Sequence, residues 1–110
     1  MIRQDILEKS RAETGALVES LKPYGPRKVI LFGSCATGDV NAHSDIDLCI
    51  IKNTPKRFLD RIAEVKEYMH SSFAVEPLVY TEEEFGRMRD EGNPFVMEIL
   101  RTGKMLYEQE

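Results

Sequence analysis

The sequence predicts an α/β or α+β fold, in which a small β-sheet is flanked by helices. Short apolar runs typical of strands alternate with amphipathic segments typical of helices, in the expected order α-β-β-α-β-α-α-β. The chain has 110 residues, the size of one domain, and 42% of them are hydrophobic, which is enough to bury a core. No linker rich in Pro, Gly or Ser divides it. We therefore expect a single domain over residues 1–110.

The first half of the chain is expected to contain one long helix and two strands. Residues 2–21 place apolar side chains on one helical stripe, and the following segment 22–26 contains two prolines, which cannot continue the hydrogen-bond ladder. Residues 28–32 (KVILF) and 46–51 (IDLCII) are apolar runs rich in β-branched residues, which indicates buried strands. Gly33-Ser34 follows the first of them, where a short helix could begin.

The middle of the chain is expected to contribute a helix and a third strand. Residues 55–71 keep apolar positions at helical spacing, and Pro55 suits the first turn of a helix. Residues 73–80 favour a strand, but Pro77 within it cannot donate to a ladder. We therefore expect this strand to lie at an edge of the sheet or to contain a bulge.

The last third is expected to hold two helices and a final strand. Thr81 and Glu84 have the spacing of a capping box, so a helix should run from there to about Glu91. Asn93-Pro94 provides an N-cap and a first-turn proline for a further helix, which Gly103 can close. Residues 104–107 could then form a short strand, which gives a mixed sheet of about four strands.

Composition and charge exclude several classes of protein. Lys and Arg number 15 against 19 Asp and Glu, which leaves a net charge of −4, so we expect no direct binding of nucleic acid. No apolar run approaches the roughly 18 residues needed to span a bilayer, and the polar N-terminus shows no signal peptide. Two cysteines do not make a disulfide scaffold. We expect a reduced, cytoplasmic protein without a membrane partner.

A pair of acids at the start of the second strand carries the strongest chemical signal. Asp45 and Asp47 are two residues apart, so in an extended chain both carboxylates point to the same side. Two such acids repel each other unless a cation lies between them, and hard oxygen ligands favour Mg²⁺ or Mn²⁺. Glu76, near the start of the third strand, could complete a site for two metal ions.

Gly33 and Ser34 add a candidate phosphate site to these acids. A glycine at the end of a strand lets the backbone approach a ligand closely. If a short helix begins at Ser34, its free N–H groups favour an anion, and the Ser34 hydroxyl can donate a further hydrogen bond. Together with the metal-binding acids, this pattern predicts a site for a nucleoside triphosphate.

The same residues resemble a known family. Gly33-Ser34 followed by residues 44–48 (SDIDL) resembles the signature of the DNA polymerase β-like nucleotidyltransferase superfamily, and the short length and the ending at residues 93–107 resemble its minimal nucleotidyltransferase (MNT) branch. The resemblance implies a palm-like mixed sheet flanked by helices, two Mg²⁺ ions, and transfer of AMP from ATP to a hydroxyl. It places Asp45, Asp47 and Glu76 as catalytic metal ligands, and Gly33, Ser34 and Ser44 as nucleotide-binding residues.

The resemblance also implies a partner. MNT proteins are often paired with a HEPN protein, a helical ribonuclease toxin, which they neutralise as antitoxins by adenylylating a tyrosine. A chain of 110 residues leaves little room for an acceptor-binding domain, so the acceptor should be held partly by another protein. A homo-oligomer and a hetero-oligomer both stay open, as do the nucleotide used and the number of nucleotides transferred.

Two departures from the family pattern keep other functions open. Many members carry an arginine soon after Gly-Ser, whereas residues 35–37 here are Cys-Ala-Thr, and the third acid is Glu76 rather than aspartate. A catalytically weak or inactive antitoxin that acts by binding is therefore one alternative, and transfer to a small molecule is another. Among single residues, Asp45 and Asp47 could instead form a turn or cap, Ser34 an ordinary helix cap, and Glu76 a solvated position.

Overall fold

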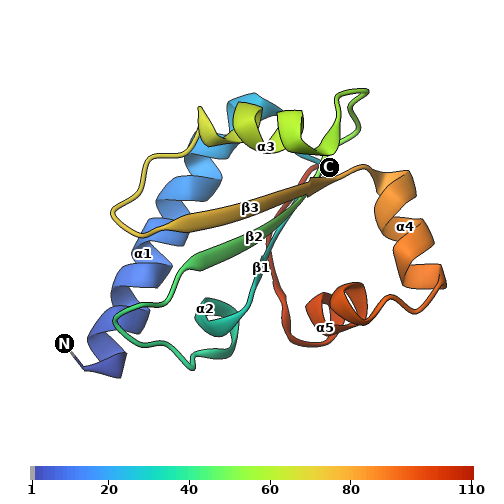
Figure 1. The fold of residues 1–110 in the computed structure, drawn as a ribbon. Helices are drawn as coiled ribbons and strands as arrows, with labels where there is room; N and C mark the ends of the chain where they lie inside the picture. Colours follow the sequence, from blue (N-terminus) through green and yellow to red (C-terminus); the bar gives the residue numbers. More distant parts are fainter. Residues whose placement is uncertain (1) are drawn as a thin grey trace.

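A four-stranded mixed sheet forms the centre of the protein. The computed structural model describes residues 2–110, and its strands follow the spatial order β3-β2-β1-β4 (Figure 1). β1 pairs antiparallel with both β2 and β4, whereas β2 and β3 run parallel. The predicted mixed sheet flanked by helices is thus confirmed. The strands are β1 (Lys28–Phe32), β2 (Ile46–Ile51), β3 (Val75–Tyr80) and β4 (Lys104–Glu108).

Helices cover both faces of the sheet. α1, α2 and α3 lie on one face and contribute to the larger apolar cluster, while α4 and α5 lie on the other (Figure 1). Within residues 2–110, none of these helices combines the length and the apolar character needed to span a lipid bilayer. The helices are α1 (Arg3–Leu21), the 3₁₀ turn η1 (Lys22–Tyr24), α2 (Ser34–Thr37), α3 (Phe58–Lys66), α4 (Glu82–Asp90) and α5 (Pro94–Thr102).

Burial on both faces explains why the two central strands are continuous apolar runs. Along β2, Leu48 and Ile50 join the cluster on the α1 side, whereas Cys49 and Ile51 join the cluster with α4 and α5. Successive side chains of a strand point to opposite faces, so both sets become buried. The free thiols of Cys35 and Cys49 are both internal, in agreement with the expectation that the chain has no disulfide scaffold.

The second predicted helix is shorter than the pattern indicates. α3 begins at Phe58 rather than at Pro55, because the hydroxyl of Thr54 accepts the backbone N–H of Lys56 at 3.2 Å in a local turn, and Arg57 keeps an extended backbone as the N-cap. The third strand likewise begins at Val75 rather than at residue 73. It lies at an edge of the sheet, as Pro77 predicts.

The capping signals are confirmed, and one of them extends into a partly buried ion pair. The Thr81 hydroxyl accepts the backbone N–H of Glu84 at 3.1 Å, and the Glu84 carboxylate accepts the backbone N–H of Thr81 at 2.8 Å. The same carboxylate binds the guanidinium of Arg61, which is 6% exposed, at 2.7 and 3.3 Å. The Arg61 guanidinium also donates to the backbone carbonyls of Lys56 and Val79. This network ties α3, β3 and α4 together.

Candidate active site

The predicted metal ligands come together where β2 and β3 begin. Asp47 in β2 is in register with Phe32 of β1 on one side and with Glu76 of β3 on the other. Registered neighbours in a sheet project to the same face, and Asp47 shares its face with Cys49, which packs against the cluster of α4 and α5. Asp45 lies one residue before β2 and two before Asp47. Asp47 and Glu76 therefore share one face of the sheet, and Asp45 lies next to them at the same end of β2.

The electrostatics of Asp47 show that these acids influence one another. Partial burial raises the pKa of Asp47, and the negative charges of Asp45 and Glu76 raise this pKa further. A divalent cation would offset this repulsion, and a set of carboxylate oxygens is the donor chemistry that Mg²⁺ and Mn²⁺ prefer. As the side chains stand within residues 2–110, no group of three Asp, Glu, His or Cys is already arranged to hold an ion.

Gly33 fits directly against the carboxylate of Asp47. Its backbone has φ 73° and ψ −159°, a conformation that side chains disfavour. A Cβ atom built on Gly33 would lie 2.3 Å from Oδ2 of Asp47. The sequence suggests a close approach of this glycine to a ligand, and the structure shows a close approach to a predicted metal ligand. A side chain at position 33 would therefore displace the Asp47 carboxylate.

Replacing Gly33 by alanine should therefore impair the site. We expect a loss of activity of about 100-fold, the scale that follows from moving a reacting group by about 1 Å. Backbone strain at this φ should lower the free energy of unfolding by about 1–3 kcal/mol. Gly15→Ala is the control, since a Cβ there meets nothing within 4 Å. Transfer assays and denaturant unfolding of both variants test this, and wild-type activity in Gly33→Ala would contradict it.

The residues predicted to bind the nucleotide form a small hydroxyl network. α2 begins at Ser34, whose hydroxyl donates to the hydroxyl of Ser44 at 3.1 Å. The Ser44 oxygen also accepts the backbone N–H of Asn41 at 2.9 Å, so it orders the loop that precedes Asp45. Gly33, Ser34 and Ser44 thus lie together beside the acids. Their role in nucleotide binding stays a prediction.

Cys35 makes a contact with the acid pair that no sequence motif indicates. Its buried thiol donates to the backbone carbonyl of Asp45 at 3.3 Å and so connects α2 to the acid pair. Burial raises the pKa of this thiol, which keeps it protonated as a donor. A sequence pattern cannot reveal such a contact, because Cys35 and Asp45 are brought together by the packing of α2 on the sheet.

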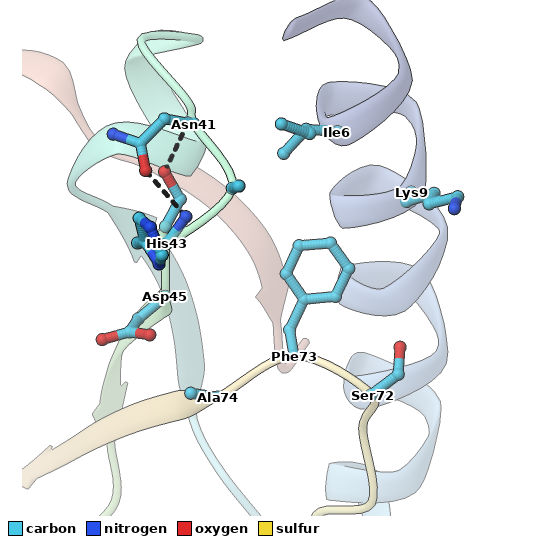
Figure 2. Close-up of a pocket in the computed structure, with 10 residues that line it drawn as sticks. Ile6, Lys9, Asn41, His43, Asp45, Ser72, Phe73 and Ala74 are labelled. Carbon is cyan, nitrogen blue, oxygen red and sulfur yellow. Dashed lines mark hydrogen bonds between the residues drawn. The ribbon is translucent and has the colours of Figure 1, made fainter. Parts of the chain in front are cut away.

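An open cavity lies between α1 and the loops that lead to the acids (Figure 2). It has a volume of about 520 Å³, and Ile6 and Lys9 line it on the side of α1. Figure 2 shows the ring of Phe73 between α1 and the loop with His43, while the Asp45 carboxylate points away from Phe73. Within this loop, the backbone N–H of His43 donates to the side chain of Asn41 at 2.8 Å.

Other solved structures share the fold of this chain, among them the following two. One is a candidate nucleotidyltransferase from Sulfolobus solfataricus, with 19% identity, a TM-score of 0.62 and coverage of 97% of this chain and 84% of that chain. The other is a chain in the structure of a toxin–antitoxin with AMP-PNP, with 17% identity, a TM-score of 0.56 and coverage of 89% and 74%. No curated protein matches.

A sequence-family model also matches this chain. The family described as "Polymerase beta, Nucleotidyltransferase" matches residues 16–110, which include all four strands and the three acids. This match confirms the resemblance carried by Gly33-Ser34 and by residues 44–48. The chain therefore belongs to the polymerase β nucleotidyltransferase family.

Proposed function

We propose that the protein is a magnesium-dependent nucleotidyltransferase that transfers AMP from ATP to a hydroxyl of a partner protein and thereby acts as its antitoxin. One observation supports this most directly. The Asp47 carboxylate lies against the backbone of Gly33, beside the start of α2. The negative charges of Asp45 and Glu76 raise its pKa. This arrangement offers a place for metal ions next to a place for phosphates, as the proposed transfer requires.

The roles of the acids follow from their positions. Asp45, Asp47 and Glu76 would hold two Mg²⁺ ions, or Mn²⁺ in their place. When bound, the metal would neutralise phosphate charge and lower the pKa of an attacking hydroxyl. Glu76 is exposed at the edge strand, so it can face an acceptor and take the proton of its hydroxyl.

The phosphates would be held by the turn after β1. The backbone N–H groups at the start of α2 would bind an anion there, and the Ser34 hydroxyl, now bonded to Ser44, could turn to a phosphate oxygen. The acceptor oxygen attacks the α-phosphorus in line. A bond forms between the acceptor oxygen and phosphorus, the bond to the bridging oxygen breaks, and pyrophosphate leaves.

The proposed acceptor is a tyrosine of a HEPN-type ribonuclease toxin. The likeness in fold to a chain of a toxin–antitoxin with AMP-PNP supports such a partner, as does the resemblance to the MNT branch. Transfer to a protein also fits the exposed position of Glu76 at an edge strand, where a large acceptor can approach.

A second candidate is an antitoxin that blocks its partner by contact alone. The observation that favours it is the composition of α2, which continues after Ser34 as Cys35, Ala36 and Thr37. This turn thus offers no arginine to clamp a triphosphate, and the Ser34 hydroxyl is engaged with Ser44. Weak binding of ATP would leave occlusion as the mode of neutralisation.

Co-expression with the product of an adjacent reading frame tests both functions. The partner would be a small helical protein with an Arg-x(4–6)-His motif. Its intact mass is measured by mass spectrometry, and any modified residue is located by peptide mapping. Transfer predicts added AMP on a partner tyrosine, which disappears in the double variant Asp45→Asn/Asp47→Asn. The matched control is Asp39→Asn, an exposed acid outside the acid cluster. Neutralisation that survives loss of both acids would support occlusion instead.

A further inference from the structure

The segment between α3 and β3 places Glu76 relative to Asp47. At the end of this segment, the backbone carbonyl of Ala74 accepts the N–H of Ile46 at 2.9 Å. Ile46 stands between Asp45 and Asp47, and two residues after Ala74 the chain reaches Glu76. The Ala74 hydrogen bond therefore extends, at the end nearest the acids, the ladder in which Asp47 and Glu76 lie side by side.

One side chain of α1 holds this segment by both of its carboxylate oxygens. Oε2 of Glu13 accepts the hydroxyl of Ser71 at 2.9 Å, and Oε1 accepts the hydroxyl of Ser72 at 2.8 Å. The Ser71 oxygen in turn accepts the backbone N–H of Phe73 at 3.0 Å. The two serine hydrogen bonds lower the pKa of Glu13, so it is ionised at neutral pH and remains an acceptor. A short polar chain thus runs from α1 to the residues that enter β3.

This polar contact lies where packing between α1 and the loops is interrupted. Ile6 and Lys9 line the open cavity of about 520 Å³, and Glu13 follows on the same side of the helix, since it is one turn beyond Lys9. Figure 2 shows Ser72 beside α1, with Phe73 and Ala74 leading away toward the sheet. The segment is held by the Glu13 hydrogen bonds on the side of α1 and by the packing of Phe73 against the larger apolar cluster.

We infer that Glu13 is a positioning residue for the acid cluster, which acts through Ser71 and Ser72 to hold Glu76 in register with Asp47. The inference rests on the proposed function, because it assumes that these acids bind a divalent ion. Loss of the contact lets the start of β3 move and weakens the metal site, although Glu13 itself touches neither metal nor substrate. Substitution of a residue that orients metal ligands in this way commonly lowers metal affinity or activity by about 10–100-fold.

Mn²⁺ binding provides a readout that does not depend on catalysis. Free Mn²⁺ is measured by electron paramagnetic resonance during titration of the intact protein without nucleotide. We expect Glu13→Ala to weaken Mn²⁺ binding about 10-fold and to lower the transfer rate by a similar factor, with the KM for ATP changed less than about twofold. Glu8→Ala is the matched control, because it removes the same charge from α1 at an exposed position whose side chain contacts Gln4.

Three further variants separate positioning from general stability. Ser71→Ala/Ser72→Ala should reproduce the loss, and its combination with Glu13→Ala should add little, since all three residues act through one contact. Glu13→Gln keeps one acceptor oxygen and should give an intermediate affinity for Mn²⁺. This variant replaces Glu13→Ala in the test if the alanine variant folds poorly. Thermal unfolding is followed in parallel for every variant.

The outcomes distinguish this inference from the proposed function. Unchanged Mn²⁺ affinity in Glu13→Ala overturns the inference, even if the melting temperature falls. Wild-type protein that binds no Mn²⁺ overturns it together with the metal site. If Mn²⁺ binding weakens in Glu13→Ala but the wild type transfers no AMP to any partner, the positioning role stands and the proposed transferase function fails.

Discussion

Changing Asp47 to asparagine is expected to abolish AMP transfer while the fold stays intact. Asp47 is the central acid of the cluster, since it lies in register with Glu76 and the charges of both Asp45 and Glu76 raise its pKa. Asparagine keeps the shape but removes the charge that would bind the metal, so we expect a loss of about 10³-fold or more. The variant also removes a partly buried charge repelled by two neighbours. Its melting temperature should therefore equal or exceed that of the wild type.

Transfer of label from α-labelled ATP, with thermal unfolding in parallel, measures both effects. Asp39→Asn serves as the control because this exposed acid lies outside the cluster and should keep wild-type activity. Wild-type label transfer by Asp47→Asn would refute the assignment of this acid. Loss of transfer accompanied by a large fall in melting temperature would indicate a structural role instead.

Replacing Arg61 by alanine is expected to produce the largest loss of stability, about 3–5 kcal/mol. The change removes four hydrogen bonds at once and leaves the Glu84 carboxylate with the backbone N–H of Thr81 but without its cationic partner. Breaking one half of a buried ion pair is more costly than removing both halves, because the remaining charge stays partly desolvated. The contact between α3, β3 and α4 depends on this network.

Urea unfolding at two pH values tests this expectation. Hydrogen bonds from Arg61 lower the pKa of Glu84 below its ordinary value of 4.5. A lowered pKa in the folded state gives stability that is present above pH 4.5 and is lost as the pH falls through the folded value. The difference between wild type and Arg61→Ala should therefore shrink in acid. Arg57→Ala, at an exposed arginine, is the control, and an equal loss in both variants would contradict the expectation.

The central strands could be predicted because their signals are strong and local. The runs 28–32 and 46–51 agree with β1 and β2, since burial on both faces favours apolar residues at nearly every position. The start of α3 could not be placed, because its N-cap is Arg57, a residue type without capping preference, while Pro55 precedes the helix. The Thr54 hydroxyl accepts the N–H of Lys56 in a turn that precedes the helix, and the pattern of apolar residues does not predict this turn.

The candidate site, like the fold, could be predicted from the sequence only in part. The convergence of Asp45 and Asp47 follows from strand alternation, and Glu76 required only the assumption that β3 lies beside β2. The fit of Gly33 against Asp47 and the contact of Glu13 with Ser71 depend on how distant segments pack, so no local pattern encodes them. The roles of the six predicted site residues stay predictions for the experiments above.

The internal thiols have a practical consequence for studying this site. Burial raises the pKa of Cys49 to about 12 and also raises that of Cys35, so neither is expected to react readily with maleimides at neutral pH. A cysteine introduced at an exposed position, such as Glu8→Cys, can then be labelled selectively in the otherwise native chain. A nitroxide attached there would act as a molecular ruler, reporting its distance from paramagnetic Mn²⁺ at the acids.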